Sequence, residues 1–369
     1  MWPIFKTKEK FLLLDVSAEK ISGLLISLDD RKKIRKEKVW ENMEKDLSSG
    51  RSRVPVFADK TIVACEPELA FKIFVPLSMK RESSNKPIER TELENILAQA
   101  IAKIFNHCRR EASLVLGMDE LDTILADSNI SEFEIDGHRV INPLGFKPAE
   151  IRAVIKMTFA GRDTFERVKA VRKKKDFFFT EKWQAQASAI ARTDSKRADL
   201  LSVCKQKSYL YYPEEDPDKA TARKEIRWSV DALTDEIKGI WDLNSKAAAN
   251  VYEYYAGEGV SVSLDRYFKK IFSKAVKNLL SQIKKLKTSA KIYVIGNIRV
   301  DLIGKNPFCE PPFRGFIEKS GFEIDMRKPS PDSEVFQQLA PFFEFYYDNS
   351  ESEINDWLKR RLNWLGSST

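Results

Sequence analysis

The stretch FLLLDVSAEKISGLLISL, residues 11–28, decides the fold that the sequence predicts. Its apolar run, Phe11 to Val16, has the length and composition of a buried strand and carries the carboxylate of Asp15 near its end. Ser17 to Lys20 has the composition of a turn, and Ile21 to Leu28 that of a second strand. We therefore expect a β-hairpin, with the charged block that begins at Asp29 on its exposed side.

A small α+β unit follows the strands of this first sheet. Thr61 to Cys65 and Ala70 to Val75 are expected to extend the sheet, and the polar segment Lys80 to Pro87 marks a crossing between modules. Thr91 to Phe105 places apolar residues at spacings of three and four, which predicts an amphipathic helix. Strand-like runs complete the unit: Ser113 to Leu116, Val140 to Phe146 and Ile151 to Phe159.

The opening pattern then repeats. A helix at Trp183 to Ala191 precedes a second expected hairpin, formed by Leu200 to Val203 and Ser208 to Tyr212. Long helices are expected at Ile226 to Trp241 and Leu264 to Leu286, before a buried strand, Lys291 to Ile295, that runs into Gly296. A chain of 369 residues exceeds what one compact core usually organises. The sequence therefore predicts two hairpin-led α/β lobes.

The charge balance gives no sign of a nucleic-acid partner. Lys and Arg number 63 against 55 Asp and Glu, an excess of 8, but the basic runs at 31–38, 172–175 and 284–287 are short and far apart. Such runs are typical of solvated faces. We expect no nucleic acid to bind.

Few side chains are available for catalysis or for a metal site. The four cysteines have no metal-ligand spacing, and His107 and His138 have no partner for a triad. We expect reduced cysteines, no metal ligands and no catalytic residue. The first ten residues lack the apolar segment of a signal peptide, and no run reaches the ~18 apolar residues of a spanning helix. The prediction is a cytoplasmic protein with at most a peripheral membrane contact.

Nearly the whole chain resembles FtsA and PilM, the actin-like proteins of bacterial cell division and type IV pilus assembly. Phe11 to Ile26 is similar to the first phosphate hairpin of that family, and Leu200 to Tyr212 to the second. Glu89 to Phe159, with Val140-Ile-Asn-Pro-Leu-Gly145, resembles its inserted strand-helix-strand-strand (SHS2) domain. Lys291 to Leu302 resembles the adenosine strand and loop.

The resemblance implies an α/β fold of the two-lobed, actin-like (ribonuclease-H-like) type with an inserted α+β domain. It implies a first lobe at 1–80, the insertion at 81–165, a return to the first lobe at 166–195, a second lobe at 196–348 and a C-terminal helix at 349–369.

The resemblance also implies ATP with Mg²⁺ between the lobes, but the phosphate loops depart from the family pattern. The first loop keeps Asp15 and has Ser17-Ala18 where the family has glycine, and the second, Ser202 to Ser208, has neither aspartate nor glycine. Phosphate cradles need glycines because backbone N–H groups must approach closely. ATPase activity is thus uncertain, and we expect none. If nucleotide binding is retained, the candidate residues are Asp15, Ser17, Glu19, Lys20, Ser202, Lys205, Lys207, Ser208, Gly296 and Asn297.

The last segment, Ser350 to Gly366, predicts an amphipathic helix with Ser350 and Glu353 as a capping box. Asn355 and Lys359 fall on its polar side. FtsA-type proteins end in a membrane-targeting helix that this tail resembles, and Trp beside Lys and Arg suits a lipid interface. The expected membrane-binding residues are Ile354, Trp357, Leu358, Lys359, Arg360, Arg361, Leu362, Trp364 and Leu365.

The resemblance, together with the tail, implies an FtsA-like adaptor that self-associates and tethers filaments of an FtsZ-type partner to the inner face of the membrane. One alternative is a PilM-like cytoplasmic scaffold of type IV pilus assembly, which would bind an N-terminal peptide of an inner-membrane partner and need no lipid helix. Another is an actin-type ATPase, which would require working phosphate loops.

Overall fold

The predicted hairpin is present and lies at the centre of a six-stranded sheet, sheet A. In the computed structural model β1 (Glu9–Val16) pairs antiparallel with β2 (Ile21–Leu28). The strand order of sheet A is β15-β3-β2-β1-β4-β9, and β4 and β9 run parallel to β1. The remaining strands are β3 (Lys33–Trp40), β4 (Lys60–Cys65), β9 (Phe177–Glu181) and β15 (Glu323–Asp325).

The structure describes residues 8–49, 58–171, 177–193, 198–205, 207–213, 222–257, 260–304, 306–325, 332–348 and 352–367.

The second lobe repeats the arrangement of the first. Sheet C has the strand order β12-β11-β10-β13-β14. Its first two strand pairs are antiparallel and its last two are parallel, which is also the pattern of β3-β2-β1-β4-β9 in sheet A. Its strands are β10 (Asp199–Val203), β11 (Ser208–Tyr212), β12 (Ala222–Ile226), β13 (Ile292–Gly296) and β14 (Phe308–Cys309). This duplicated order gives the actin-like fold, as the sequence predicted.

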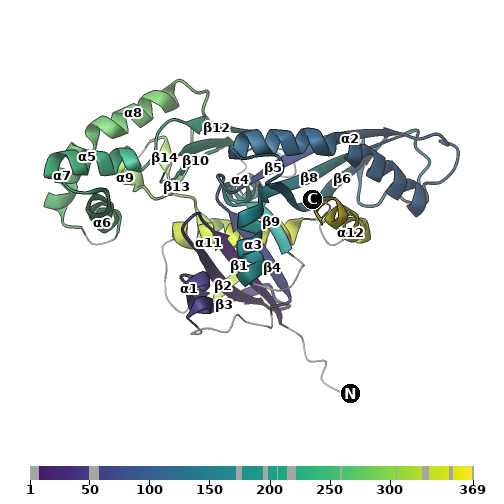
Figure 1. The fold of residues 1–369 in the computed structure, drawn as a ribbon, viewed down its shortest axis with the longest axis horizontal. Helices are drawn as coiled ribbons and strands as arrows, with labels where there is room; N and C mark the ends of the chain where they lie inside the picture. The colour runs from purple at the N-terminus through teal and green to yellow at the C-terminus, as the bar shows by residue number, and fades with distance from the viewer. Residues whose placement is uncertain are drawn as a thin grey trace, which may run out of the picture.

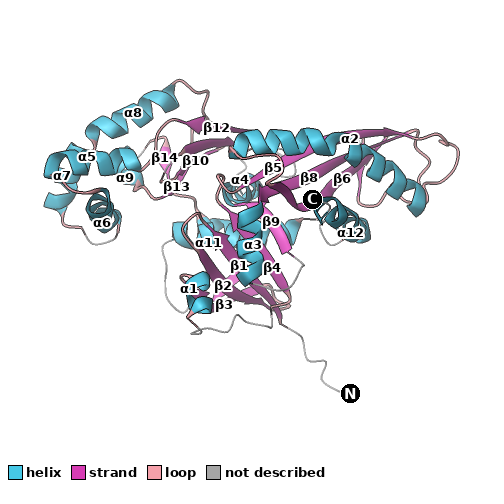
Figure 2. Ribbon diagram, in the orientation of Figure 1, coloured by secondary structure: helices cyan, strands magenta, loops and turns pink. Residues whose placement is uncertain are grey.

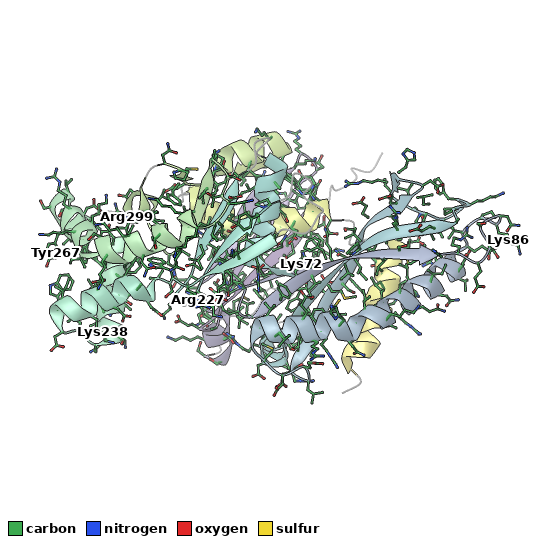
Figure 3. All side chains as sticks on the ribbon, turned by 90° about the horizontal axis from the view of Figure 1, so that it is seen from above. Lys72, Lys86, Arg227, Lys238, Tyr267 and Arg299 are labelled. Carbon is green, nitrogen blue, oxygen red and sulfur yellow. The ribbon has the colours of Figure 1, made fainter. Side chains whose placement is uncertain are left out.

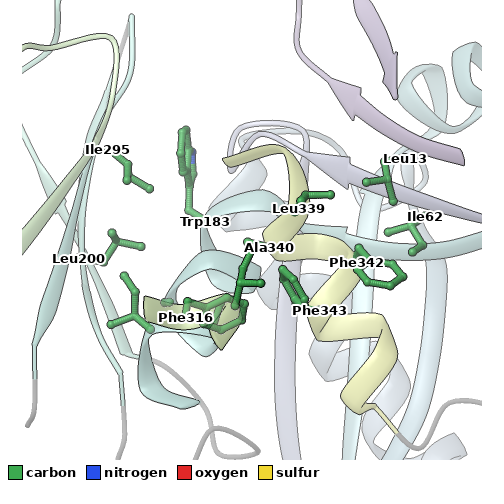
Figure 4. Packing of buried hydrophobic residues seen from close by; sticks show 14 of the residues in the cluster. Leu13, Ile62, Trp183, Leu200, Ile295, Phe316, Leu339, Ala340, Phe342 and Phe343 are labelled. Atoms are coloured by element: carbon green, nitrogen blue, oxygen red, sulfur yellow. The ribbon is translucent and has the colours of Figure 1, made fainter. Parts of the chain in front are cut away.

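Three helices fill the space between the two sheets: α4 (Lys182–Thr193), α10 (Phe313–Ser320) and α11 (Asp332–Tyr347). Figure 4 shows Phe342 and Phe343 of α11 near Leu13 and Ile62 of sheet A, while Leu200 and Ile295 of sheet C lie on the far side of α4. One apolar core therefore joins the lobes. Figure 2 shows the three sheets with helices against them. The outer face of sheet A carries α1 (Met43–Ser48) and α3 (Arg162–Val171).

The outer face of sheet C carries a helical layer with a second core, which includes Trp228, Phe268, Phe272 and Leu279. Its helices are α5 (Asp231–Trp241), α6 (Ser245–Ala256), α7 (Val262–Ile271), α8 (Ser273–Lys284) and α9 (Val300–Ile303). This layer and the inserted module lie at opposite ends of the longest axis (Figure 1).

The inserted module is a four-stranded antiparallel sheet, sheet B, with the order β5-β8-β6-β7 and with α2 packed on it. Its elements are β5 (Ala70–Lys80), α2 (Arg90–Leu116), β6 (Thr123–Ile135), β7 (His138–Val140) and β8 (Glu150–Gly161). The last helix, α12 (Glu353–Ser367), packs beside β6.

Several boundaries differ from the prediction. Ala70 to Val75 pairs with β8, so it opens sheet B and does not extend sheet A. Ser113 to Leu116 is the last turn of α2, where Leu114 and Val115 are exposed, and not a strand. The expected helix at 264–286 divides at Phe272 into α7 and α8, and the one at 226–241 begins only at Asp231.

The chain also returns to the first lobe earlier than expected. β15 pairs with β3, and α11 packs against β1, β4 and α4, so the segments 313–325 and 332–348 belong largely to the first lobe. Among the described residues, no helix combines the length and apolar character needed to cross a bilayer.

Candidate functional site: the cleft between the lobes

Two adjoining cavities lie between the lobes, at the turns of the two hairpins. The smaller has a volume of about 270 Å³ and is lined by both lobes, and the larger, of about 790 Å³, lies mainly against the second lobe. They share four lining residues: Glu19, Lys205, Gly296 and Asn297. In an actin-like fold this position faces the carboxyl ends of the central strands, where ligands bind in open α/β sheets.

The smaller cavity receives side chains from three neighbouring parallel strands of sheet A. Asp15 lies at the end of β1, Glu66 follows β4 and Lys182 follows β9. The Lys182 Nζ donates to Asp15 Oδ2 at 2.7 Å. Burial alone would lower the pKa of Lys182, but the charge and hydrogen bond of Asp15 outweigh it and raise that pKa. The buried lysine is therefore charged and already paired.

A second ion pair crosses from one lobe to the other. The Lys205 Nζ, on the β10–β11 turn, donates to Glu19 Oε1, on the β1–β2 turn, at 2.6 Å. This hydrogen bond lowers the pKa of Glu19 and raises that of Lys205. Both side chains are more than half exposed, so the pair contributes little to stability by itself. It does connect the two turns across the cleft.

Three backbone N–H groups of the two turns donate hydrogen bonds within their own turn. Ser17 N–H donates to Lys20 O at 3.0 Å, and Lys20 N–H donates to Ser17 Oγ at 3.2 Å. On the facing turn, Cys204 N–H donates to Lys207 O at 3.2 Å. Donors engaged in this way do not point at a phosphate, which agrees with the missing glycines.

Gly296 is required by the packing of two strand ends. Its φ is +100°, and a Cβ there would lie 2.1 Å from the carbonyl oxygen of Val203. The following Asn297 N–H donates to that same oxygen at 3.1 Å. The close approach of β13 to β10 explains this glycine without a ligand.

Carboxylates outnumber cations around both cavities. The smaller one is lined by Asp15, Glu19, Glu66 and Glu68 against Lys20, Lys182 and Lys205. The larger adds Asp231, Glu253, Asp301 and Glu310 against Arg299. Burial raises the pKa of Glu66 to about 7 and also raises that of Glu68. The cause is burial, which disfavours the charged form of each carboxyl group.

The residues of the cleft therefore do not fit ATP with Mg²⁺. A triphosphate would meet excess carboxylates, while Lys182 and Lys205 are already paired and the N–H groups of Ser17, Lys20 and Cys204 are bonded within their turns. No cluster of metal-ligating side chains occurs among the described residues.

Deeper in the interface, Glu181 of β9 connects the lobes. Its Oε1 accepts from Tyr211 OH of the second lobe at 3.0 Å and from Trp183 N–H at 3.0 Å. Arg223 of β12 lies 3.9 Å from its Oε2 and stacks on Phe71 of the inserted module, 4.5 Å from the ring centre. Burial raises the pKa of Glu181 to about 7. Three parts of the molecule meet at this one carboxyl group.

The C-terminal helix is docked onto the inserted module, next to α2. Ile354 and Leu358, expected to face lipid, are 9% and 0% exposed in the core of sheet B, and Trp357 is half-buried there. Asn355, expected on the polar side, is 1% exposed. Its Oδ1 accepts from Ile130 N–H at 2.7 Å and its Nδ2 donates to Ile130 O at 3.1 Å.

These contacts have a clear physical reason. Within the described part of the chain, the outer edge of β6 has no neighbouring strand beyond the short β7, and the Asn355 amide supplies the hydrogen bonds that such a strand would make. Lys359 lies 3.5 Å from the buried Asp127, and Arg90 of α2 binds Glu353 at 2.8 Å.

The helix start also differs from the prediction. Ser352 Oγ accepts from Asn355 N–H at 3.3 Å and so caps the helix, whereas Ser350 lies outside the described residues. Arg360 and Arg361 are exposed, and the side chains of Leu362, Trp364 and Leu365 lie outside the described ones.

Comparisons with known proteins found similar chains among solved structures. No family model matches the sequence, and no curated protein matches it. Among solved structures, a PilM–PilN type IV pilus biogenesis complex is similar over 92% of this chain and 96% of the other, at 12% identity and a TM-score of 0.47. MreB 5 of Spiroplasma citri bound to AMPPNP is similar over 95% and 98%, at 10% identity and a TM-score of 0.36. A Bacteroides thetaiotaomicron protein with an actin-like ATPase fold and unknown function is similar over 91% of this chain and 98% of the other, at 10% identity and a TM-score of 0.36.

The structure gathers most of the predicted nucleotide residues in one place. Seven of the ten line the smaller cavity: Asp15, Ser17, Glu19, Lys20, Lys205, Gly296 and Asn297. The other three do not. Ser202 and Ser208 are buried, and Lys207 pairs with Glu225 at 3.6 Å. Sequence reasoning missed Glu66, Glu68 and Lys182. The signal available for Glu66 was its place directly after a predicted buried strand.

Proposed function

We propose that this protein is a non-catalytic, actin-fold scaffold that works by binding other proteins at a membrane-associated assembly. The observation that carries the proposal is the set of side chains in the cleft. Lys182 with Asp15 and Lys205 with Glu19 form ion pairs where a nucleotide's phosphates would need free cations and backbone donors. The lobes are held together by protein contacts, including Glu181 with Tyr211.

Of the two scaffold roles, the docked α12 favours the PilM-like one. A division tether of the FtsA kind needs α12 free for lipid, whereas here Leu358 is fully buried and Asn355 is bonded to β6. A cytoplasmic scaffold that binds a segment of an inner-membrane partner needs no lipid helix. The tether to an FtsZ-type filament is thus the less favoured role in this conformation, and the actin-type ATPase lacks a suitable cleft.

Self-association measured with and without nucleotide tests this function. Sedimentation velocity of the intact chain, over a range of concentrations, should give the same assembly state in buffer and with 1 mM MgATP, because no contact between lobes depends on nucleotide. An assembly state that changes with MgATP and is insensitive to the matched non-nucleotide polyanion, tripolyphosphate, would contradict the proposal.

A further inference from the structure

One segment of the second lobe carries only positively charged side chains and no acidic ones. From Arg266 to Arg299 there are ten Lys or Arg residues and no Asp or Glu. The formal charge of this segment, +10, exceeds the +8 of the whole chain, so the rest of the molecule sums to −2. The charge of the protein is thus concentrated on α7, α8 and the segment that follows them.

Most of these cations are exposed and unpaired. Among the described residues, Arg266, Lys270, Lys274, Lys277, Lys284, Lys285 and Lys287 are exposed and make no ion pair, whereas Lys269 binds Asp265 and Asp301. Free, exposed cations of one sign create a long-range attraction for a polyanionic surface.

Helical spacing places the cations of α8 on the side of the helix that faces away from its buried residues. The buried face of α8 is Ala275, Val276, Leu279 and Ile283, and positions 274, 277, 284 and 285 fall opposite it. α7 and α8 are separate helices that meet at Phe272, whose N–H donates to Phe268 O and whose carbonyl oxygen accepts from Val276 N–H. We name the exposed residues Arg266, Lys270, Lys274, Lys277, Lys284 and Lys285 the basic stripe.

The charged residues of another long helix of the same chain are not all of one sign. The charged residues of α2 are of mixed sign: Arg90, Glu92, Glu94, Lys103, Arg109, Arg110 and Glu111. A helix face that merely meets water can carry both signs, as α2 does.

Exposed aromatic and aliphatic side chains adjoin the basic stripe. Tyr267, 45% exposed, lies between Arg266 and Lys270 on α7 and stacks on Trp241 of α5 at 6.1 Å. Trp241 is itself 37% exposed and follows Ile240, 50% exposed. Figure 3 shows Tyr267 and Lys238 at the end of the molecule formed by this helical layer. The phosphates of a nucleic-acid duplex would use the cations alone, whereas cations beside Trp, Tyr and aliphatic side chains suit the headgroup region of a bilayer.

We infer that the basic stripe, with Tyr267, Trp241 and Ile240, is the face that docks on an anionic membrane surface. The inference rests on the membrane-associated role proposed above and moves the lipid contact from α12 to the second lobe. Each cation near an anionic leaflet strengthens binding about fivefold at moderate salt.

Co-sedimentation with vesicles tests this assignment. The intact chain should pellet with vesicles of 30% phosphatidylserine in phosphatidylcholine at 100 mM NaCl, and not with phosphatidylcholine alone. The triple variant Lys274→Gln/Lys277→Gln/Lys284→Gln should bind about 100-fold more weakly. The matched control, Lys86→Gln/Lys103→Gln/Lys147→Gln, loses the same charge from exposed sites on the inserted module and should bind within threefold of the wild type. Tyr267→Ser should weaken binding severalfold without a change in salt dependence.

Three outcomes would overturn the assignment. The first is no pelleting of the intact chain with the anionic vesicles, and the second is equal weakening by the stripe and control triple variants. The third is loss of binding in Arg360→Gln/Arg361→Gln but not in the stripe variant, which would return the lipid contact to α12. Tight binding of a labelled DNA duplex that the stripe variant loses and Tyr267→Ser keeps would assign the stripe to nucleic acid instead. None of these results bears on the sedimentation experiment with MgATP that tests the scaffold role. Each of the two proposals can therefore be refuted without the other.

Discussion

The docking of α12 rests on one amide side chain, and Asn355→Ala should release it. The two hydrogen bonds of Asn355 satisfy Ile130 N–H and Ile130 O in a buried position. Leaving each group unpaired costs about 1–3 kcal/mol, and the lower part of that range, about 1–2 kcal/mol for each of the two groups, means that the substitution should weaken docking by about 2–4 kcal/mol. At about 1.4 kcal/mol per tenfold, the ratio of docked to released α12 falls by roughly 30-fold to 800-fold.

Hydrogen exchange of one amide reports the loss of this contact. The Ile130 N–H donates to Asn355, so it should exchange only when α12 leaves β6. In Asn355→Ala its exchange should accelerate by the factor above, while Met157, on the central strand β8, keeps its rate. Asp356→Ala, which alters the exposed neighbour, is the matched control and should change neither rate by more than about threefold. The reasoning is refuted if Ile130 exchanges at the wild-type rate in Asn355→Ala, or if Met157 accelerates equally.

Three further predictions concern the core of the molecule. Burial raises the pKa of Glu181 to about 7 from about 4.5, so the folded protein holds a proton that the unfolded chain releases. The free energy of unfolding should therefore fall by up to about 3 kcal/mol as pH rises from 5 to 8. In urea titrations, Glu181→Gln should reduce the dependence of this free energy on pH. A pH dependence equal to that of the wild type would contradict this prediction. Gly296→Ala should destabilise by about 3 kcal/mol or more, because its Cβ would overlap Val203 O and its φ is +100°; an unchanged thermal midpoint would count against it. Lys72 binds Glu344 at 2.7 Å in a buried site, so Lys72→Met should cost about 3–5 kcal/mol and Lys72→Met/Glu344→Leu should recover most of it; a double variant no better than the single would show that the ion pair is not the cause.

The hairpins and the two-lobed architecture could be predicted because their signal is local. Buried strands such as Phe11 to Val16 and Leu200 to Val203 are short apolar runs, and the polar turn after each fixes the hairpin. The same local criterion failed at Leu114 and Val115. These residues form an apolar run that was taken for a strand, yet they lie exposed in the last turn of α2.

The role of α12 could not be predicted for a different reason. The sequence showed an amphipathic helix, but periodicity does not say what covers the apolar face. Asn355 falls on the polar side of that pattern, and only the unpaired edge of β6, more than 200 residues away along the chain, gives it a buried partner. The cleft shows the same limit. Asp15 was recognised at a strand end, whereas Lys182 became visible only when β9 was placed beside β4.

Calorimetric titration of the intact chain with MgATP tests most directly whether the cleft works without nucleotide. Because Lys182 and Lys205 are paired and the carboxylates of the cleft are in excess, we predict no saturable heat up to about 1 mM ligand, which corresponds to a binding free energy weaker than about −4 kcal/mol. Glu66→Gln/Glu68→Gln, which removes two of the carboxylates, should bind MgATP at least as well as the wild type. Saturable binding of MgATP by the wild type below about 0.1 mM, abolished by Lys182→Gln, would contradict the account.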